Sequence, residues 1–457
     1  MRISRLTAIA LAGATVLAVL GAGTAPAARA TPDTSDASVA LPAASGARVA
    51  PVSAAGGASP AGRRVEAFGE DGSISRAVVP AQSPFLSPRL TAGIAGDGAV
   101  TSVVRNGGID AKLDVVVIGD GYTAEEQEKF HADAAAKWRE ITAVEPYATY
   151  RSLFNVWAVD AVSAQSGISG DPERSTVRDT ALGAYFWCED LERLLCVDTA
   201  AVDRYAAKAP QADLVVVVAN SAKYGGAGYN DVVSPLGYSG IATVAGGNPR
   251  SGQIAVHETG HSLGKLADEY FYDGYGTYGG DEPPEANTTV LTAREMRREH
   301  EKWYRWLGRT SPDGGTVGAY EGGGYYPLGI YRPTDNSIMR SLGREFNLPG
   351  REAMIAGFYR YASPLDSATS TDTVLTGADR LAVDLPVAGT RLRWYLDGRE
   401  VRGLAGGTAI SVADLGLTGP KGRRHRLTAV ATDPTPAVLD PEPRESLTDA
   451  LSWEVTR

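Results

Sequence analysis

Residues 256–270 read Val256-His257-Glu258-Thr259-Gly260-His261-Ser262-Leu263-Gly264-Lys265-Leu266-Ala267-Asp268-Glu269-Tyr270. His257 and His261 are four residues apart, so on a helix their imidazoles project from one face and can bind one zinc ion. Glu258 lies one step further round that helix, near enough to accept a proton from a zinc-bound water. With five His in the whole chain, chance is a poor explanation for this pattern. The segment predicts a catalytic zinc site, with a non-catalytic metal site as the alternative.

The third protein ligand is expected shortly after this helix. Gly264 stands where the chain would end the helix and turn back toward the metal, a layout shared with the metzincins. The position that usually holds their third ligand is Ala267, which cannot coordinate. We therefore expect Asp268 to be the ligand, because it needs a turn only one residue longer, with Glu269 as the alternative. A Glu ligand on a later helix, as in thermolysin, is a further alternative, which the turn expected at Gly264 disfavours.

A methionine turn and a tyrosine are expected to complete the site. Met339, in Asn336-Ser337-Ile338-Met339-Arg340, is the candidate for a Met turn beneath the metal, and ordinary core packing is the alternative. Many metzincins place an oxyanion-stabilising Tyr two residues after the Met, but Ser341 stands there. The candidate donors are therefore Tyr325, Tyr326 and Tyr331, which the sequence does not rank. Tyr270 is expected to pack, and the remaining His are expected at the surface: His131, His300 and His425.

With these motifs the chain resembles the IgA-peptidase-like metallopeptidases (igalysins) of the metzincin group. The resemblance rests on His257–His261 with residues 266–270, on Val117-Ile118-Gly119-Asp120-Gly121-Tyr122-Thr123, and on Tyr331-Arg332-Pro333, and it covers residues 110–362. It implies a zinc-dependent endopeptidase with a zincin-type α/β domain, a mixed sheet and an active-site helix. It also implies an edge strand that aligns extended substrate, for which Ile241–Val244 is the candidate. The sequence gives no motif for a structural Ca²⁺ ion, which stays open.

Three segments come before the main domain. Arg2 and Arg5, an apolar run and Ala28-Arg29-Ala30 predict a secretory signal peptide over residues 1–30, with a membrane anchor as the alternative. Residues 31–63 are rich in Ala, Gly, Pro and Ser, which indicates a low-complexity linker or pro-segment. Residues 64–110 alternate weakly and predict a small strand-rich lead-in.

Two folded domains are expected beyond this point. Residues 111–363 contain buried strands near 113–118, 154–159, 214–218 and 241–244, and a helix over 123–141 opened by a capping box, which is typical of an α/β sheet domain. Residues 364–457 contain short strands near 391–396, 426–431 and 451–455, with Asp397-Gly398 as a hairpin turn. That spacing predicts a small all-β sandwich as an accessory domain.

Charge and cysteine content limit the partners and the compartment. The chain has 44 Lys+Arg against 54 Asp+Glu, a net charge of −10, which argues against nucleic acid and anionic membrane surfaces. Cys188 and Cys196 are the only cysteines, and we expect a disulfide across a broken amphipathic helix spanning residues 186–196; two free thiols are the alternative.

The sequence therefore predicts a secreted, extracellular and monomeric zinc endopeptidase that acts on a protein or peptide. The alternative from another class is a secreted, adhesin-like binding protein that retains a structural zinc. An intact Glu258 favours the enzyme.

Overall fold

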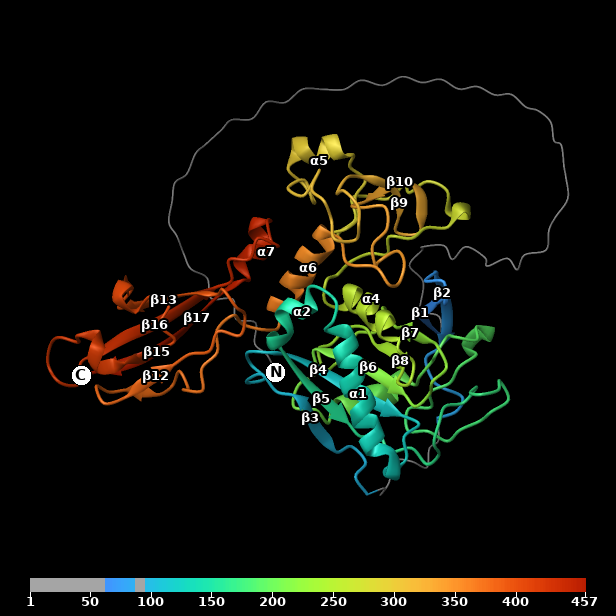
Figure 1. Cartoon of the computed structure of the whole chain (residues 1–457), viewed down its shortest axis with the longest axis horizontal. Helices are drawn as coiled ribbons and strands as arrows, with labels where there is room; N and C mark the ends of the chain where they lie inside the picture. Colours follow the sequence, from blue (N-terminus) through green and yellow to red (C-terminus); the bar gives the residue numbers. More distant parts are fainter. Residues whose placement is uncertain (1–61, 87–94) are drawn as a thin grey trace, which may run out of the picture. The chain divides into compact units, whose positions relative to one another are not determined.

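The computed structural model describes residues 62–86 and 95–457 (Figure 1). The predicted signal peptide and all but the last two residues of the predicted linker, 31–63, lie outside the described residues. Within the described ranges, no helix is both long enough and apolar enough to cross a membrane.

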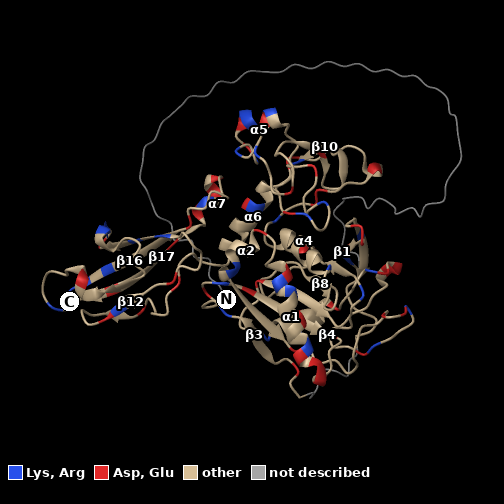
Figure 2. Ribbon diagram, viewed as in Figure 1, with Lys and Arg blue, Asp and Glu red and all other residues tan. Residues whose placement is uncertain are grey.

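A mixed eight-stranded sheet forms the centre of the larger, N-terminal part of the described chain, in the order β2-β1-β7-β8-β6-β4-β5-β3. Its strands are β1 (Gly62–Phe68), β2 (Ile74–Pro80), β3 (Val100–Val104), β4 (Leu113–Asp120), β5 (Phe154–Val159), β6 (Leu214–Ala219), β7 (Gly226–Gly228) and β8 (Ala242–Ala245). Strands β5, β4, β6 and β8 run parallel, and the outer strands pair antiparallel. The parallel strands are continuous apolar runs because both of their faces are covered. Most charged residues accordingly lie on helices and loops (Figure 2).

Helices cover both faces of this sheet. They are α1 (Gln127–Ile141), α2 (Tyr147–Tyr150), α3 (Thr199–Ala206), α4 (Gly252–Ser262) and α6 (Leu348–Tyr359). Helix α5 (Ala293–Glu299) packs in a separate small core with Trp303 and Trp306. Val115 and Val117 of β4 point into a core shared with α1, α4 and α6, whereas Val116 and Ile118 point into a second core shared with α3. The capping box expected at Thr123 and Glu126 is present, and it opens a 3-10 turn, η1 (Ala124–Glu126), that leads into α1. The predicted α/β class with a mixed sheet is confirmed.

The strand proposed to align substrate is not an edge strand. Thr243 of β8 lies opposite Val217 of β6 on one side and Ala227 of β7 on the other, so β8 is inside the sheet. The prediction failed because β7 is the tripeptide Gly226-Ala227-Gly228, whose composition gives no strand signal. Strand β1 then pairs with β7, with Glu66 opposite Gly228.

The amphipathic segment 186–196 is broken and bridged by a disulfide, as expected. Only the short turn η3 (Cys188–Asp190) forms, because Trp187, Glu189 and Asp190 adopt left-handed backbone conformations with φ of 64°, 50° and 61°. Cys188 and Cys196 are joined by a disulfide, with their Cα atoms 6.0 Å apart. The loop that they close pairs with β7, since the Gly226 amide donates to the Arg193 carbonyl at 3.1 Å. The disulfide loop therefore supports the short strand.

The C-terminal part is built of strands around its own core. A five-stranded sheet has the order β11-β17-β16-β13-β14, and a separate pair joins β12 to β15. The strands are β11 (Val374–Leu375), β12 (Arg380–Ala382), β13 (Arg391–Leu396), β14 (Arg399–Glu400), β15 (Ala409–Ser411), β16 (Arg424–Thr432) and β17 (Thr448–Thr456). The core centres on Trp394 and Trp453. Asp397-Gly398 forms the expected two-residue turn between β13 and β14, and a short helix, α7 (Pro441–Glu445), precedes β17.

Short elements complete the described chain. The hairpin of β9 (Tyr320–Gly323) and β10 (Tyr326–Arg332) lies in the segment between α5 and α6. The remaining 3-10 turns are η2 (Arg151–Leu153), η4 (Asp273–Tyr275), η5 (Arg402–Leu404) and η6 (Val412–Leu415).

Candidate active site

Helix α4 carries the histidine pair and is packed closely from below by Met339. A Cβ on Gly260 would lie 2.5 Å from Met339 Sδ, so this position of the helix has room only for glycine. After Ser262 the chain turns under the helix, and the Leu266 amide donates to the Gly260 carbonyl at 3.1 Å. A Cβ on Gly264 would lie 2.7 Å from Met354 Sδ, which shows that this glycine permits close packing of the turn. The turn brings Asp268 back to the histidines.

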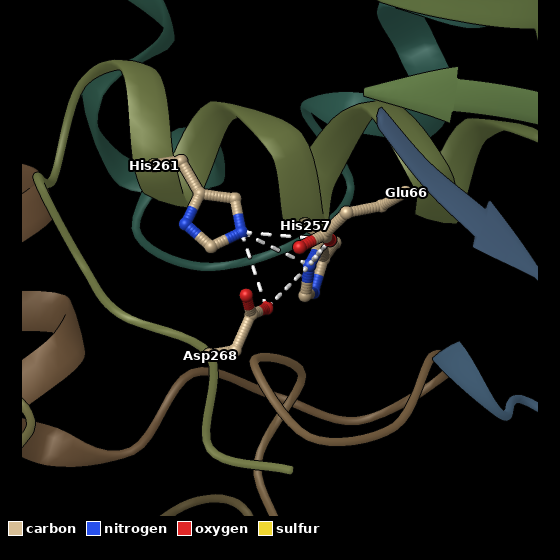
Figure 3. A group of neighbouring side chains, drawn as sticks. All are labelled: Glu66, His257, His261 and Asp268. Carbon is tan, nitrogen blue, oxygen red and sulfur yellow. Dashed lines mark hydrogen bonds and ion pairs between the residues drawn. The ribbon is translucent and has the colours of Figure 1, made fainter. Parts of the chain in front are cut away.

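Four side chains from three segments converge here: Glu66 from β1, His257 and His261 from α4, and Asp268 from the turn (Figure 3). Their ligand atoms all lie within 4.8 Å of one another. The two Nε2 atoms are 3.2 Å apart. Asp268 Oδ1 lies 3.4 Å from His257 Nε2 and 3.3 Å from His261 Nε2. Glu66 Oε2 lies 3.0 Å and 3.7 Å from the same two atoms.

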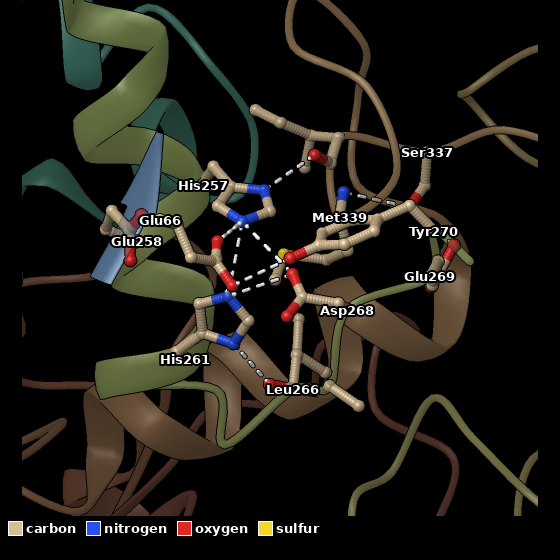
Figure 4. Close-up of polar contacts among 12 residues, drawn as sticks. Glu66, His257, Glu258, His261, Leu266, Asp268, Glu269, Tyr270, Ser337 and Met339 are labelled. Carbon is tan, nitrogen blue, oxygen red and sulfur yellow. Dashed lines mark hydrogen bonds and ion pairs between the residues drawn. The ribbon is translucent and has the colours of Figure 1, made fainter. Parts of the chain in front are cut away.

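Backbone carbonyls fix how both imidazoles face. His257 Nδ1 lies 2.9 Å from the Ile338 carbonyl, and His261 Nδ1 lies 2.7 Å from the Leu266 carbonyl (Figure 4). A carbonyl can only accept, so each Nδ1 carries the proton and donates it. Each Nε2 is then directed into the cluster, as in metal-binding histidines oriented by an outer partner. Ile338 and Met339 thus hold the site from beneath, where the sequence placed its Met turn.

The electrostatics of the cluster are those of a cation site. Burial disfavours the protonated form of His257, but Asp268 and Glu66 outweigh this and raise its pKa to about 10. Burial likewise opposes charge on Asp268, yet the two histidines hold the pKa of its carboxyl well below its usual value. Two buried carboxylates therefore stabilise positive charge between the imidazoles.

The two acids that follow Ala267 have different surroundings. Asp268 faces the histidines, and its Oδ2 accepts a hydrogen bond of 2.5 Å from the Tyr325 hydroxyl. Glu269 is turned away into a polar pocket, where its carboxylate accepts hydrogen bonds at 2.7–3.0 Å from Ser337, Asn287 and Asn347. The Glu269 amide donates to the Met339 carbonyl at 2.8 Å. Glu269 therefore ties the turn to the Met339 segment.

Glu258 lies buried on α4, beside the cluster. Neither carboxylate oxygen has a hydrogen-bond partner among the described residues. A Cβ on Gly228 of β7 would lie 1.7 Å from the Glu258 carboxyl carbon, so the acid occupies space that only a glycine leaves free. Burial, with the negative charge of Glu66, raises the pKa of Glu258 to about 8. A buried carboxyl without a fixed partner is suited to exchange a proton with a bound molecule.

Of the three tyrosines considered for the oxyanion, the structure brings Tyr325 to the cluster. Burial, and then Asp268, raise the pKa of Tyr325 well above its usual value, so its hydroxyl keeps the proton and acts as a donor. Tyr326 instead packs against Tyr275 and Tyr278, and Tyr331 pairs through its backbone with Thr289.

Two sequence expectations need revision, and one residue of the cluster was not predicted. Tyr270 does more than pack, since its hydroxyl donates to Glu66 Oε1 at 3.1 Å. His300 is exposed and His131 half-buried, but His425 is buried and pairs with Asp397 at 2.7 Å, so its surface assignment was wrong. Glu66 was missed altogether; the only signal was an acid between Val65 and Ala67 in an otherwise apolar strand end.

The donor set matches zinc chemistry. Two imidazole nitrogens with carboxylate oxygens are typical zinc ligands in catalytic sites. Asp268 Oδ1 is buried and lacks a hydrogen-bond partner within residues 62–86 and 95–457, which leaves it free to ligate. The residues therefore fit a zinc ion. Beside them lies a cavity of about 270 Å³, whose lining includes His261, Asp268 and Tyr325 together with Pro283 and Ile330.

Comparison with known families agrees with this chemistry. The family model described as IgA Peptidase M64 matches residues 102–313 and 309–358, which is more than half of the chain. No curated protein matches the chain. The family match confirms the resemblance drawn from the motifs and implies that the protein is a peptidase with a metal centre. It begins after β1 and β2, so Glu66 lies outside it. The chain belongs to the IgA peptidase M64 family.

Proposed function

We propose that this protein is a secreted, zinc-dependent endopeptidase in which His257, His261 and Asp268 hold the metal and Glu258 is the general base. The observation that carries the proposal is the buried pair of oriented imidazoles with Asp268 on one side and an unbonded Glu258 carboxylate on the other. We propose a monomer with a zincin-type catalytic domain, a β-sandwich accessory domain, and protein or peptide as substrate.

The chain's own residues supply proton transfer and orientation. When bound, zinc supplies Lewis acidity, which lowers the pKa of a ligated water and polarises a peptide carbonyl. Glu258 accepts a proton from the attacking water at its carboxylate and returns it to the amide nitrogen that leaves. The Tyr325 hydroxyl donates its proton to Asp268 Oδ2 in the free protein. In the reaction it turns from Asp268 to donate that proton to the oxygen that gains negative charge. The Nδ1 hydrogen bonds keep both imidazoles in place throughout.

The cavity next to His261 is our candidate for a substrate side-chain pocket. Its volume of about 270 Å³ and its mixed lining, with Leu266 and Ile330 among polar groups, suit one side chain of an extended peptide. The predicted signal peptide over residues 1–30 and the Cys188–Cys196 disulfide support an extracellular setting.

Substitution of the base tests the catalytic assignment. Glu258→Gln should retain zinc but lower the rate of cleavage of casein by roughly 10²–10⁴-fold, because the amide cannot accept the proton. Glu125→Gln, on an exposed acid of η1, serves as the control and should behave as wild type. Equal activity of the Glu258 variant and the parent protein would end this proposal.

A binding protein with a structural zinc is the second candidate. Glu66 supplies a fourth protein ligand atom, and closed four-ligand sets are typical of structural zinc sites, whereas catalytic sites keep one position open. The role of Glu66 therefore decides between a structural and a catalytic metal.

A further inference from the structure

Glu66 occupies the place that a catalytic metal site needs to keep open. Its Oε2 is 3.0 Å from His257 Nε2, the residue is 3% exposed, and its other oxygen accepts a hydrogen bond from Tyr270. With His257, His261 and Asp268 it completes a four-donor set. A water molecule and a substrate carbonyl would have to displace this carboxylate before reaching a metal held there.

Strand β1 occupies the edge of the sheet next to Glu258, the proposed general base. Within the family match, which begins at residue 102, β7 is the outer strand on this side, and β1 adds to it antiparallel with Glu66 opposite Gly228. Gly228 is the residue against which Glu258 packs. An extended peptide bound by strand addition next to Glu258 would use the same edge. The β1 strand and such a peptide therefore exclude each other.

The hairpin makes further contacts with the residues of the site. The Phe68 ring meets the His257 ring edge-on, with 5.5 Å between the centroids. From β2, the Arg76 guanidinium lies 4.2 Å from the centre of the Tyr325 ring. Glu66 and Arg76 face each other across the hairpin. One segment thus covers a metal ligand, the candidate oxyanion donor and the open metal position together.

The hairpin is held by apolar side chains in both cores and by a few polar contacts at its turn. Phe68 and Ile74 pack in one core, and Val65, Ala67 and Val79 in the other. The Tyr224 hydroxyl donates to the Gly69 carbonyl at 3.2 Å, and the Leu342 amide donates to the Gly72 carbonyl at 3.3 Å. The Glu70–Arg250 pair at 3.2 Å is exposed on both sides, and such pairs contribute about 0–1 kcal/mol. Glu66 is thus the polar anchor of the hairpin inside the site, beside these apolar contacts.

We propose that the β1–β2 hairpin is a built-in inhibitor. Glu66 blocks the open metal position and β1 takes the strand position of an extended substrate, so the peptidase is latent while the hairpin is docked and becomes active when it leaves. This inference rests on the proposed function, because it assigns a regulatory state to the same site.

Access to the metal can be measured without any substrate. The full chain is loaded with Co²⁺ in place of zinc and titrated with acetohydroxamate, which binds open metal positions, while the visible absorption of the cobalt is followed. Wild type should not respond at concentrations that saturate Glu66→Ala, whose apparent affinity should be at least about tenfold higher. Glu70→Ala, which removes an acid from the turn of the same hairpin, should match wild type. A wild-type response equal to that of Glu66→Ala would overturn the proposal.

Zinc content and casein cleavage complete the test. Glu66→Ala should keep its zinc on the three remaining ligands and cleave casein at least about tenfold faster than wild type, and adding Glu258→Gln should abolish the gain. Glu66→Gln keeps the side-chain volume and should behave in the same way if Glu66→Ala folds poorly. Loss of zinc in both variants would make Glu66 a permanent structural ligand and overturn the proposal.

The two proposals fail in distinguishable ways. Equal casein cleavage by wild type and Glu66→Ala would contradict latency and leave the peptidase standing. An acetohydroxamate response confined to the Glu66 variants, without cleavage, would support the blocking contact and contradict the peptidase.

Discussion

Asp268 and Glu269 are adjacent, yet their carboxylates face different environments. Asp268→Ala should strip zinc during dialysis against a weak chelator, because it removes a carboxylate oxygen next to both histidines. Glu269→Ala should retain most of the metal, since Glu269 acts on the site through Ser337, beside the carbonyl that orients His257. Losses at such positions weaken metal affinity about 10–100-fold.

Metal analysis and thermal unfolding separate these two roles. In Glu269→Ala, Ser337, Asn287 and Asn347 lose their acceptor in a buried pocket. The free energy of unfolding should therefore fall by about 1–3 kcal/mol, the cost of leaving one buried polar group without its partner. An empty site in Glu269→Ala beside a full one in Asp268→Ala would show that we have the roles reversed.

Gly228 is the residue that gives Glu258 its room. In Gly228→Ala the new methyl would lie 1.7 Å from the Glu258 carboxyl carbon, so the acid must move. Misplacing a reacting group by about 1 Å can cost roughly 10²-fold in rate. We expect that loss in kcat/KM for casein, measured in the Glu66→Ala background with zinc content unchanged.

The control for Gly228→Ala is Gly279→Ala. A Cβ on Gly279 would have no heavy atom of the described residues within 4 Å apart from its excluded chain neighbours, so its activity should stay at the parent level. Full activity in Gly228→Ala would show that the Glu258 side chain can move and still act as the general base.

The spacing of residues along the sequence predicted the site residues on α4, but it could not reveal Glu66, which is far from α4 in the sequence. His257, Glu258 and His261 lie on one short helix, so their helical periodicity brings them together whatever the rest of the chain does. Glu66 is 191 residues away from His257 and reaches it only through the pairing of β1 with β7. Local patterns hold no information on such a pairing, which depends on the whole sheet.

At the scale of elements, the disulfide loop and β7 depend on each other. Replacing both cysteines of this bridge in Cys188→Ser/Cys196→Ser should lower the free energy of unfolding by about 2–3 kcal/mol, the value expected for a loop of this length. Because Arg193 and Leu195 bond to Gly226, the loss should be concentrated at β7. Hydrogen exchange should then accelerate at Gly226 and Ala227 more than at β4, and uniform acceleration across the sheet would contradict this coupling.

The apolar strands were predictable and their neighbours were not. Buried Val and Ile runs located β4, β5 and β6, because strands covered on both faces read as continuous apolar segments. Strand β7 consists of small residues that form a strand only between β8 and the segments beside it. Missing it moved β8 to the edge in our prediction. In the segment 186–196 the expected break of the amphipathic helix is made by left-handed residues in the disulfide-closed loop.

At the scale of the whole molecule, the C-terminal part is joined to the catalytic part by Asp433. Its Oδ2 accepts hydrogen bonds of 2.9 Å from both the Tyr150 and Tyr359 hydroxyls, and all three side chains are buried. Asp433→Ala would leave two buried hydroxyls without their acceptor, each costing about 1–3 kcal/mol. We expect the free energy of unfolding to fall by at least the cost of one such group, measured by denaturant titration.

The matched control is Asp372→Ala, because this acid is exposed in the same part of the chain. A surface substitution of this kind should change stability by about 0.5 kcal/mol or less. If Asp433→Ala is equally silent, the two parts are held together by other contacts. Val438 and Leu447, which share the apolar core with α6, would then be the next pair to change.

After Ser363 the sequence pattern changes to short apolar segments separated by Gly, Pro and Asp. This pattern predicted a second part with short strands, and the structure has such strands there. The sequence did not reveal how firmly it is attached. No local sequence pattern links Tyr150, Tyr359 and Asp433, and 283 residues separate Tyr150 from Asp433. Only the folded chain brings an acceptor from one part to the hydroxyls of the other.

The residues of the metal cluster are far apart in the sequence, so the cluster can assemble only late in the synthesis of the chain. Glu66 and His257 are 191 residues apart, and the carbonyl that orients His257 belongs to Ile338, a further 81 residues on. Contacts of this sequence separation form late, after the intervening chain has closed its loops. A nascent chain that has emerged only as far as α4 holds both histidines but not the oriented pair. Zinc capture should therefore follow completion of the α/β part, and pulse-labelled hydrogen exchange during refolding should protect β4 and β6 before α4.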